Sequence, residues 1–482
     1  MALGLVKQIV IAEYFGTTAQ LDSFLIATAV PSVFSGIALS VFSSSLIPIL
    51  TPISHVRKEF SQAVSTVTFM TLIFVAILIG VGIGGKELIL GISTNLSDSG
   101  LALAARLAGY VWLITGFVIL NALCVSLFNL HKQFIFAAVT GLFPTIGMIL
   151  GTFFLGASIG IEGLVIGWLG MTVLSSLALL PVLVRCGVSW QEIRLASPCA
   201  REFLKALVLV SVGLLPFTVF PSLDAFWASS LAEGSMSYIG YCTRIAIGIA
   251  SLVVTGVYAV ILPHLSENVA ANDLDAFWRR LRLAIKYVLL ITIPLVTFFA
   301  FFGREVVTIL FQRGHFSEES TSSVSSLLPF YLIGLLAMAP ATILSRGYFA
   351  LKRYRQFGLL SLTVVAVYFV VSGVLSRYYS FYGIGVTYAI YWVLFFSAGI
   401  FLLDRNVLGT DTLMAALKCG ACSVVGSAVA YVVFSVSLRF PLGMTLLLEG
   451  CLATFLFLLL AHALRLTELD SLRVEVLSIA RK

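Results

Sequence analysis

The sequence has few charged residues for its length, since Lys, Arg, Asp and Glu make up 11% of its 482 residues. A soluble globular domain carries about 25% charged residues, so this composition excludes an ordinary soluble protein. Instead, 60% of the residues are apolar and the mean hydropathy is +1.08. Because roughly 20 apolar residues are needed for one helix to cross a bilayer, the composition predicts an all-α polytopic membrane protein.

Motifs for metal, nucleotide or catalytic chemistry are also absent from the sequence. The five histidines never recur at i+3 or i+4, and the sequence contains neither an HExxH motif nor a paired-cysteine metal spacing. It has no GxxxxGK[ST] loop, which argues against an ATP-driven pump. The longest polar connections, near 185–202 and 265–282, are too short for a catalytic domain. We therefore expect no enzyme, no metal site and no cofactor.

The seven cysteines lie mostly within apolar stretches, which argues against the disulfide framework of a secreted protein. Cys419 and Cys422 form a CxxC motif, but a thioredoxin-like motif needs a soluble βαβ context that the apolar flanks do not provide. Segment 1–14 has no basic region followed by a small-residue cleavage site. We therefore expect a short first helix there rather than a signal peptide.

Apolar stretches separated by polar or Gly/Pro-rich joints predict about fourteen transmembrane helices. The expected spans are 1–14, 22–50, 63–84, 102–129, 133–155, 160–184, 203–231, 236–263, 283–302, 320–347, 357–376, 382–403, 413–437 and 442–464. With the N-terminus inside, the cytoplasmic segments hold nineteen Lys and Arg residues and the outer segments hold five. This asymmetry follows the positive-inside rule. It also explains the net charge of +7, so no nucleic-acid partner is expected.

Short segments of the first half of the chain return, in the same order, in the second half. LDSF at 21–24 returns as LDAF at 223–226, and IPIL around Pro48 returns as LPHL around Pro263. Farther along, GGKEL returns as FGREV with an offset of 218, and FNLHK returns as FALKR with an offset of 221. Ordered matches of this kind indicate duplication of a six-helix unit.

An even number of helices gives the two copies the same orientation in the membrane, so the copies are related by an axis along the membrane normal. We expect a cavity between them. Helices 1–6 form the expected N-terminal lobe in residues 1–200, and helices 7–12 form the C-terminal lobe in 201–408. Two further helices and a cytoplasmic tail make up the expected third part, 409–482.

An ionisable side chain at membrane depth is costly unless it faces a cavity or a partner, so each one is a functional candidate. Arg244 has no charged neighbour in its apolar stretch. It either holds a phosphate of the substrate or forms an ion pair with Asp22 or Asp224 that fixes the two lobes. The two aspartates are related by the repeat, and they either bind a cation or proton that couples transport or act as a structural pair or helix cap.

Four further basic residues lie within or near the expected spans. Lys7 is on the first span and is a candidate for binding the substrate. Arg106, Lys286 and Arg346 are weaker candidates, because long basic side chains near helix ends usually extend to the membrane surface.

Several motifs resemble those of one known family. LFQRGHFSEES at 310–320 and ILSRGYFALKRYRQ at 343–356 resemble the paired signatures of MviN/MurJ-type lipid-linked-sugar flippases, members of the MOP exporter superfamily. The opening segment 4–34 and the segment 240–267 resemble the beginning and the eighth helix of that family. The likeness runs in order along most of the chain.

The resemblance implies a bacterial inner-membrane protein with both termini in the cytoplasm and two six-helix lobes in a V that work by alternating access. It further implies a central cationic cavity for a diphosphate and sugar, with a groove of the last two helices for the polyprenyl tail. Arg244 matches the cavity arginine, Lys7 stands in place of an arginine of the first helix, and Asp22 matches the Asp of the second. Asp224 falls at an acidic position of helix seven. We expect Lys7, Arg244 and Asp22 to bind substrate, and Asp22 and Asp224 to couple ions.

The sequence departs from the family pattern at several positions. Ser35 and Gly36 stand where peptidoglycan-precursor flippases carry an arginine, and Ile247 replaces an acidic residue. For sodium, span 357–376 offers only hydroxyl side chains, those of Ser361, Thr363 and Ser372. These departures favour a related substrate, such as the polyprenyl-linked repeat unit of an exopolysaccharide.

The sequence therefore predicts an inner-membrane flippase that moves a polyprenyl-phosphate-linked saccharide to the outer leaflet. A lipid II flippase of peptidoglycan synthesis is the first alternative. A membrane scaffold of a polysaccharide synthase is the second, and a drug/cation antiporter of the same superfamily, which needs an acidic cavity, is the third. The expected partners are the glycan lipid, the bilayer, and proteins of polysaccharide or peptidoglycan synthesis.

Overall fold

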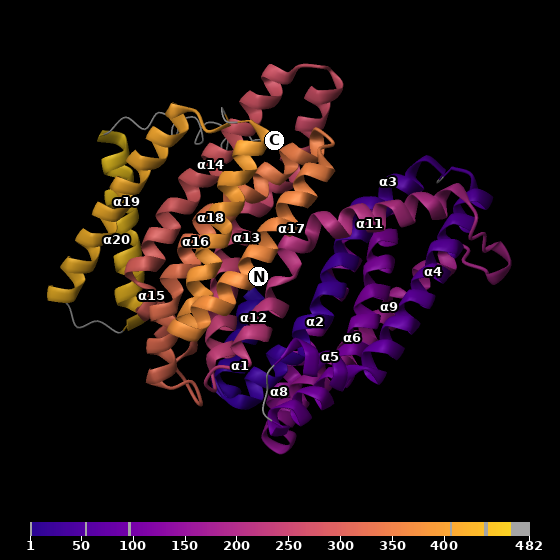
Figure 1. The fold of residues 1–482 in the computed structure, drawn as a ribbon, viewed down its shortest axis with the longest axis horizontal. Helices are drawn as coiled ribbons and strands as arrows, with labels where there is room; N and C mark the ends of the chain where they lie inside the picture. Colours follow the sequence, from indigo (N-terminus) through magenta and orange to yellow (C-terminus); the bar gives the residue numbers. More distant parts are fainter. Residues whose placement is uncertain (1, 54, 95–97, 405–406, 438–441, 464–482) are drawn as a thin grey trace. The chain divides into compact units, whose positions relative to one another are not determined.

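The computed structural model describes residues 2–53, 55–94, 98–404, 407–437 and 442–463. In this part of the chain every regular element is helical, which confirms the all-α prediction (Figure 1). Twelve of these helices are long and apolar enough to cross a membrane. Helices suit this environment because each one satisfies its own backbone hydrogen bonds where no water is present.

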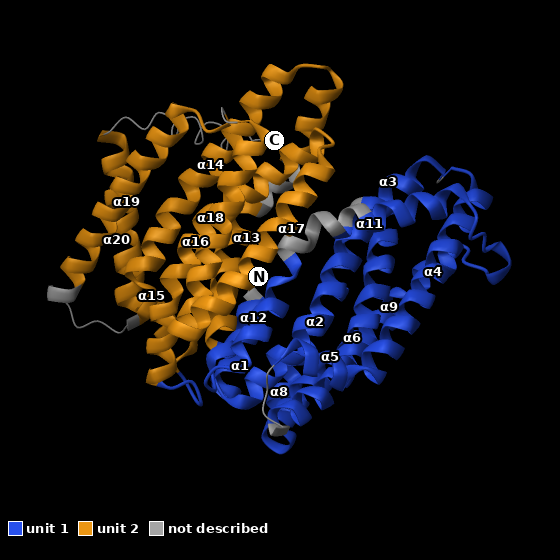
Figure 2. Ribbon diagram, in the orientation of Figure 1, with its two compact units in different colours: residues 1–237, 313–317 blue, residues 238–312, 318–482 orange. Residues whose placement is uncertain are grey.

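The chain forms two compact units, which Figure 2 shows in different colours. Unit 1 consists of Met1–Ser237 and Arg313–Ser317, and unit 2 consists of Tyr238–Gln312 and Glu318–Lys482. The predicted lobe boundary after residue 200 rests on the internal duplication, whereas the units rest on packing, which adds the next two helices to unit 1. The predicted three-part division stays a prediction.

Unit 1 begins with a short helix and continues with long apolar ones. Its helices are α1 (Ala2–Phe15), α2 (Ala19–Val41), α3 (Ile47–Leu50), α4 (Arg57–Gly84), α5 (Lys86–Ser93), α6 (Asp98–Leu130), α7 (Phe134–Thr140), α8 (Phe143–Ile159), α9 (Ile161–Leu179), α10 (Pro181–Arg185), α11 (Pro198–Thr218) and α12 (Phe220–Ala228). A wide π-helical turn, Phe42–Leu46, joins α2 to α3, and short 3-10 turns stand at Thr51–Ile53 and Trp190–Glu192. Within the unit, α2 packs against α6, α11 and α12.

Unit 2 contains the remaining helices, apart from the first residues of α13. They are α13 (Ser235–Ala270), whose first residues belong to unit 1, α14 (Leu274–Phe301), α15 (Gly303–Phe311), α16 (Glu318–Ala350), α17 (Tyr354–Tyr379), α18 (Phe381–Leu403), α19 (Thr410–Ser437) and α20 (Leu442–Ala463). Helices α19 and α20 run side by side at one edge of the unit (Figure 1). They pack on α14 through an apolar cluster that includes Leu290, Cys419 and Phe457.

Three of the predicted spans are divided at a proline. Span 160–184 consists of α9 and α10, and α10 begins at Pro181. Span 133–155 consists of α7 and α8, and the break lies just before Pro144. Span 203–231 consists of α11 and α12, and the break lies just before Pro221. Proline lacks a backbone N–H and restricts the residue before it, so a helix often ends at such a position.

Short helices mark the other differences from the predicted spans. α1 has 14 residues and rises about 21 Å, less than the roughly 30 Å of a hydrocarbon core. The helices α5 and α15, with 8 and 9 residues, were not predicted, because they are far shorter than a membrane-length apolar window. Each follows directly after a 28-residue helix, α4 and α14.

The backbone itself repeats between the two halves. Lys132 and Lys352 both adopt left-handed conformations, with φ of 59° and 57°, just after a long helix. In both turns the next residue donates its N–H to the carbonyl five residues earlier, as in a Schellman motif. Gly160 (φ 62°, ψ −141°) and Ser380 (φ 53°, ψ −139°) share a second unusual conformation. Both pairs differ by 220 residues, which corrects the offset of 221 taken from FNLHK and FALKR.

Glycines bring α8 and α9 into unusually close contact. Gly147 and Gly151 on α8 face Gly163 and Gly167 on α9, in a reciprocal GxxxG pattern. A Cβ atom on Gly167 would lie 2.6 Å from the Cα of Gly151 and would overlap the carbonyl oxygen of Gly147. Small residues let membrane helices approach closely and gain van der Waals contact, so this pattern holds the two helices together.

Gly167→Ala is expected to destabilise unit 1, because the added methyl group forces α8 and α9 apart. Overpacking of this kind costs about 1–3 kcal/mol. The matched control is Gly170→Ala on the same helix, where a Cβ meets nothing within 4 Å. Thermal unfolding in detergent should show a lower Tm for Gly167→Ala alone. Equal Tm values for the two variants would contradict the close-packing account.

Candidate functional site

Arg244 lies on one open face of α13. Its neighbours Tyr241, Cys242 and Ile245 are buried, whereas Ile247 is 54% exposed and no atom lies within 4 Å of a Cβ built on Gly248. Arg244 itself is half-buried. Residues 244, 247, 248 and 251 follow the i, i+3, i+4, i+7 spacing of one helix face. Arg244 and Gly248 therefore share one face of the helix, and a Cβ at Gly248 would meet open space.

The opposite face of α13 fixes this orientation by packing within unit 2. The Tyr241 ring lies 4.9 Å from the Phe311 ring of α15, and the Cys242 thiol donates a hydrogen bond to the Val324 carbonyl of α16 at 3.4 Å. Near the start of the helix, the Tyr238 ring lies 5.1 Å from Phe381 of α18. These contacts hold α13 against α15, α16 and α18 within unit 2.

Among the described residues of unit 2, no carboxylate forms an ion pair with Arg244. The ion pairs observed join other residues, such as Arg304 with Glu318 and His264 with Glu267. A charged group at membrane depth is costly without water or a partner, which keeps Arg244 a functional candidate.

Lys7 is half-buried on α1, next to the buried stripe of Gln8, Ile11 and Phe15. α1 packs on α8, where the Tyr14 ring lies 6.4 Å from Phe153. Lys7 belongs to unit 1 and Arg244 to unit 2. Their joint action on one substrate stays a prediction.

The Asp22 carboxylate caps the N-terminus of another helix. Its Oδ2 accepts a hydrogen bond from the Gly234 N–H at 2.7 Å, and its Oδ1 accepts from the Ser237 N–H at 2.7 Å and from the Ser237 hydroxyl. These donors stand at the beginning of α13. An anion at a helix N-terminus meets both unpaired N–H groups and the positive end of the helix dipole. The geometry is therefore that of the helix cap, one of the two interpretations of Asp22 left open by the sequence.

A second carboxylate makes this capping reciprocal. Glu233, which directly precedes the start of α13, accepts a hydrogen bond from the N–H of Ala19 at 2.7 Å. Ala19 is the first residue of α2, the helix that carries Asp22. The N-termini of α2 and α13 are thus each capped by a carboxylate from the other segment, and all five residues involved belong to unit 1.

Asp224 is buried on α12, which packs against α2. The Ser222 hydroxyl of the same helix donates a hydrogen bond to the Ala29 carbonyl of α2 at 3.0 Å. Both predicted ion-coupling residues, Asp22 and Asp224, therefore lie in one unit on adjacent helices. Their role in ion coupling stays a prediction.

The three weaker basic candidates lie in different surroundings. Arg106 on α6 forms an ion pair with Glu162 of α9 at 3.0 Å, and its side chain is 66% exposed, as expected for a residue that extends to the surface. Lys286 on α14 and Arg346 on α16 are both half-buried in unit 2. The structure thus assigns Arg106 a protein partner. Substrate contact by any of the three stays a prediction.

Two sequence motifs from distant parts of the chain meet in unit 1. The His315 N–H, in the RGHF segment, donates a hydrogen bond to the Glu13 carbonyl at 2.9 Å. Gly16 and Gly314 both adopt positive φ, 54° and 55°. A Cβ on Gly16 would overlap the His315 carbonyl, and a Cβ on Gly314 would overlap the Glu13 carbonyl. Both positions therefore require glycine.

Sequence reasoning missed Glu233, Ser237 and the contact of the two glycines. A glycine directly after the short apolar α1 is a helix-end signal, and Gly314 stands in a motif that the resemblance had singled out. Neither signal says that the two segments meet, because they lie about 300 residues apart. Ser237 follows Asp22 by 215 residues, so local patterns could not pair them.

The described residues contain no group of three or more His, Cys, Asp or Glu side chains that could hold a metal ion. All seven cysteines are free thiols. In the connection after α10, burial raises the pKa of Cys186 to about 11, which keeps it in the unreactive thiol form at neutral pH. The Cys419 thiol, within α19, contacts the Leu290 carbonyl at 3.6 Å.

The profile of the family described as "Lipid II flippase MurJ" matches residues 11–450, most of the chain. The chain belongs to the MurJ family of lipid II flippases. It is therefore a membrane transporter rather than an enzyme, and both the suspected resemblance and the prediction of no catalytic activity are confirmed by this membership.

Relatives from several bacteria support the assignment. A probable lipid II flippase of Vibrio cholerae is 26% identical over 411 residues, which is 80% of this chain and 76% of the relative. A probable lipid II flippase of Treponema pallidum is 24% identical over 367 residues, 72% of this chain and 68% of the relative. The lipid II flippase of Burkholderia cenocepacia is 25% identical over 367 residues, with 72% and 70% covered.

Solved structures show the same fold. A lipid II flippase in an inward closed conformation matches with a TM-score of 0.81 and 21% identity over 96% of both chains. An inward-facing multidrug transporter of the MATE family, in the MOP superfamily, matches with a TM-score of 0.71 and 13% identity over 85% of this chain and 95% of the other. These likenesses show that the chain shares the fold of both structures.

Asp22→Asn is expected to lower the free energy of unfolding by about 1–3 kcal/mol, because an amide nitrogen then faces a buried N–H donor. Ser237→Ala should also destabilise the protein, but by less in the Asp22→Asn background than in the wild type. Glu267→Gln, which changes an exposed carboxylate, is the control. Unfolding curves of the two single variants and the double variant provide the measurement. Fully additive losses would refute the capping contact.

Proposed function

We propose that this protein moves lipid II from the cytoplasmic to the outer leaflet by alternating access. Family membership and the relatives described as lipid II flippases support this substrate. The sequence departures at Ser35, Gly36 and Ile247 had favoured a polysaccharide repeat unit. The comparisons favour the alternative substrate, lipid II. The relatives from Treponema pallidum and Vibrio cholerae are described as probable lipid II flippases, and the match covers more than two thirds of each relative.

The observation that carries this proposal is the Arg244 guanidinium on α13, which forms no ion pair with a carboxylate among the described residues of unit 2. A guanidinium binds a diphosphate through two parallel charge-assisted hydrogen bonds, which suits the headgroup linkage of a polyprenyl-diphosphate lipid. Lys7 supplies the second cation. Because translocation breaks no covalent bond, the protein needs only to bind the headgroup on one side and release it on the other.

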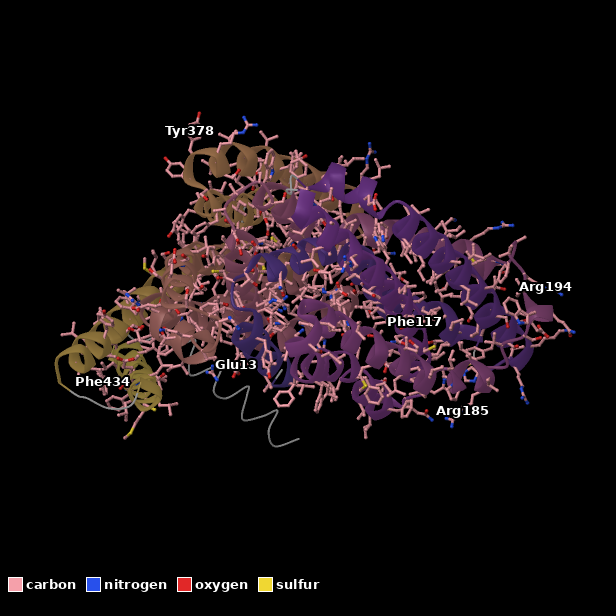
Figure 3. The ribbon with its side chains drawn as sticks, turned by 90° about the horizontal axis from the view of Figure 1, so that it is seen from below. Glu13, Phe117, Arg185, Arg194, Tyr378 and Phe434 are labelled. Carbon is pink, nitrogen blue, oxygen red and sulfur yellow. The ribbon has the colours of Figure 1, made fainter. Side chains whose placement is uncertain are left out.

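We also propose the orientation with both termini in the cytoplasm. Basic residues of the assigned cytoplasmic connections support it: Arg185 and Arg194 are exposed and point away from the body of unit 1 in Figure 3. The outer connections hold fewer positive charges. In this orientation the capped N-termini of α2 and α13 and the RGHF segment all stand on the outer side of unit 1.

Further roles remain proposals of the same kind. Asp22 in substrate binding, Asp22 and Asp224 in ion coupling, and Arg106, Lys286 and Arg346 as weaker substrate contacts all depend on the transport cycle. For Asp22 such a role requires release from the helix N-terminus that it caps. Enzymes of peptidoglycan or polysaccharide synthesis are the proposed protein partners.

Arg244→Ala is expected to abolish growth when it replaces the flippase in a bacterial strain depleted of its own lipid II flippase. The variant loses the cation that holds the diphosphate, while the packing face of α13 is unchanged, so its membrane abundance should match the wild type. Arg244→Lys keeps the charge but loses the bidentate geometry, and it should restore growth only in part. Colony formation after depletion, with immunoblots of membrane fractions, measures both.

The matched control is Arg377→Ala, which removes an exposed arginine at the end of α17 and should leave growth normal. Normal growth with Arg244→Ala would show that this guanidinium is structural. Failure of the wild-type chain to restore growth, despite normal abundance, would instead favour the polysaccharide repeat unit as substrate.

A further inference from the structure

Two carboxylates stand on α15 and α20, helices of unit 2 that pack against each other. Glu449 on α20 is only 5% exposed, and its Oε2 has no hydrogen-bond partner among the described residues. Glu305 on α15 also has a buried Oε2 without such a partner. The helices are in contact, and the two carboxyl groups are close enough for their charges to act on each other.

The surroundings of the pair are apolar. Phe302, Ala430 and Ala453 form a buried cluster there, with Phe298 and Leu446 packed against it. A Cβ on Gly450, next to Glu449, would lie 3.6 Å from the Phe298 ring. In such apolar surroundings two ionised carboxylates close together would repel each other at high cost.

Among the described residues, no ionisable group on a neighbouring element forms an ion pair with either carboxylate. Arg304, next to Glu305 on α15, points to an exposed ion pair with Glu318 of α16 at 3.5 Å. On α19, the Tyr431 ring packs on Phe302 at 6.0 Å and carries no charge at neutral pH. Lys418 stands at the far end of α19, about 18 Å from Ala430 along the helix. The last twelve residues of α14 contain no ionisable side chain.

The first half of the chain shows what changes when the last helices are absent. GKE at 85–87 is the sequence counterpart of GRE at 303–305, so Glu87 on α5 corresponds to Glu305. Glu87 is exposed. Helices α19 and α20 lie outside the duplicated part, and α20 contacts α15 in unit 2. Glu305, whose Oε2 is buried, thus lies in the half to which a second carboxylate has been added, whereas its counterpart Glu87 is exposed.

We propose that Glu305 and Glu449 share one proton and form a proton-binding site between α15 and α20. One proton satisfies both free oxygens, since a protonated carboxyl donates and the remaining carboxylate accepts. A metal cation fits less well, because no third His, Cys, Asp or Glu ligand joins the pair among the described residues. Loss of the proton leaves two like charges that push α20 away from α15.

Infrared spectroscopy of the purified protein in lipid nanodiscs tests the site directly. The wild type should show a protonated-carboxyl C=O band at neutral pH that shifts in heavy water. Both Glu449→Gln and Glu305→Gln should lose this band, and Glu87→Gln should keep it. The use of two variants on different helices keeps the test decisive if one of them fails to fold.

Three outcomes would overturn the proposal: no such band in the wild type, a band unchanged in both variants, or a band removed by adding sodium chloride. The last result would mean that a metal cation occupies the site. The infrared band is measured without a lipid substrate. A negative result would therefore contradict the proton-binding site and leave the proposed transport of lipid II untouched.

Thermal unfolding at several pH values gives a second readout. If the folded protein keeps a proton that the unfolded chain releases, stability falls as pH rises. The Glu449→Gln variant lacks this penalty, so its Tm relative to the wild type should increase from mildly acidic to mildly basic pH. A constant difference in Tm across that range would contradict the shared proton.

Discussion

The bilayer interior offers no water to polar groups, and this constraint governs every charged residue inside the protein. It bears on three sites in the structure. Asp22 is held by the N-terminus of α13, where three donors surround the carboxylate. Arg244 lies on the same helix face as the exposed Ile247 and forms no ion pair with a carboxylate among the described residues of unit 2. Glu305 and Glu449 lie on packed helices beside an apolar cluster, where the proposed shared proton removes one of the two charges.

Much of the fold could be predicted from the sequence, because a membrane helix is specified by one long apolar window. The helices α13, α18 and α20 begin within one residue of their predicted spans. An apolar window does not predict helices much shorter than the membrane, such as α5 and α15. It also does not predict the points where a proline divides an apolar stretch into two helices, as before Pro144 and Pro221. Duplication was visible in four short motifs, and repeated turns such as those at Lys132 and Lys352 now support it.

The candidate site could be predicted only in part. A charged residue within an apolar stretch is conspicuous in the sequence, so Arg244, Lys7 and Asp22 could be named as candidate site residues from the sequence pattern and the family resemblance. Their partners could not, because a hydrogen bond from Ser237 to Asp22 joins positions 215 residues apart. Glu449 was not recognised either, since a lone acidic residue in the last helix becomes informative only when Glu305 is seen beside it.

Translocation by the purified protein in liposomes tests the central claim most directly, namely that a cation within the membrane binds the diphosphate of a lipid-linked sugar. Fluorescent lipid II and a neutral polyprenyl glycoside with the same tail would be compared in the same vesicles. If the cation binds the diphosphate, lipid II should reach the opposite leaflet without ATP, and the neutral lipid should not. Equal rates for the two lipids, or no movement of lipid II, would contradict it.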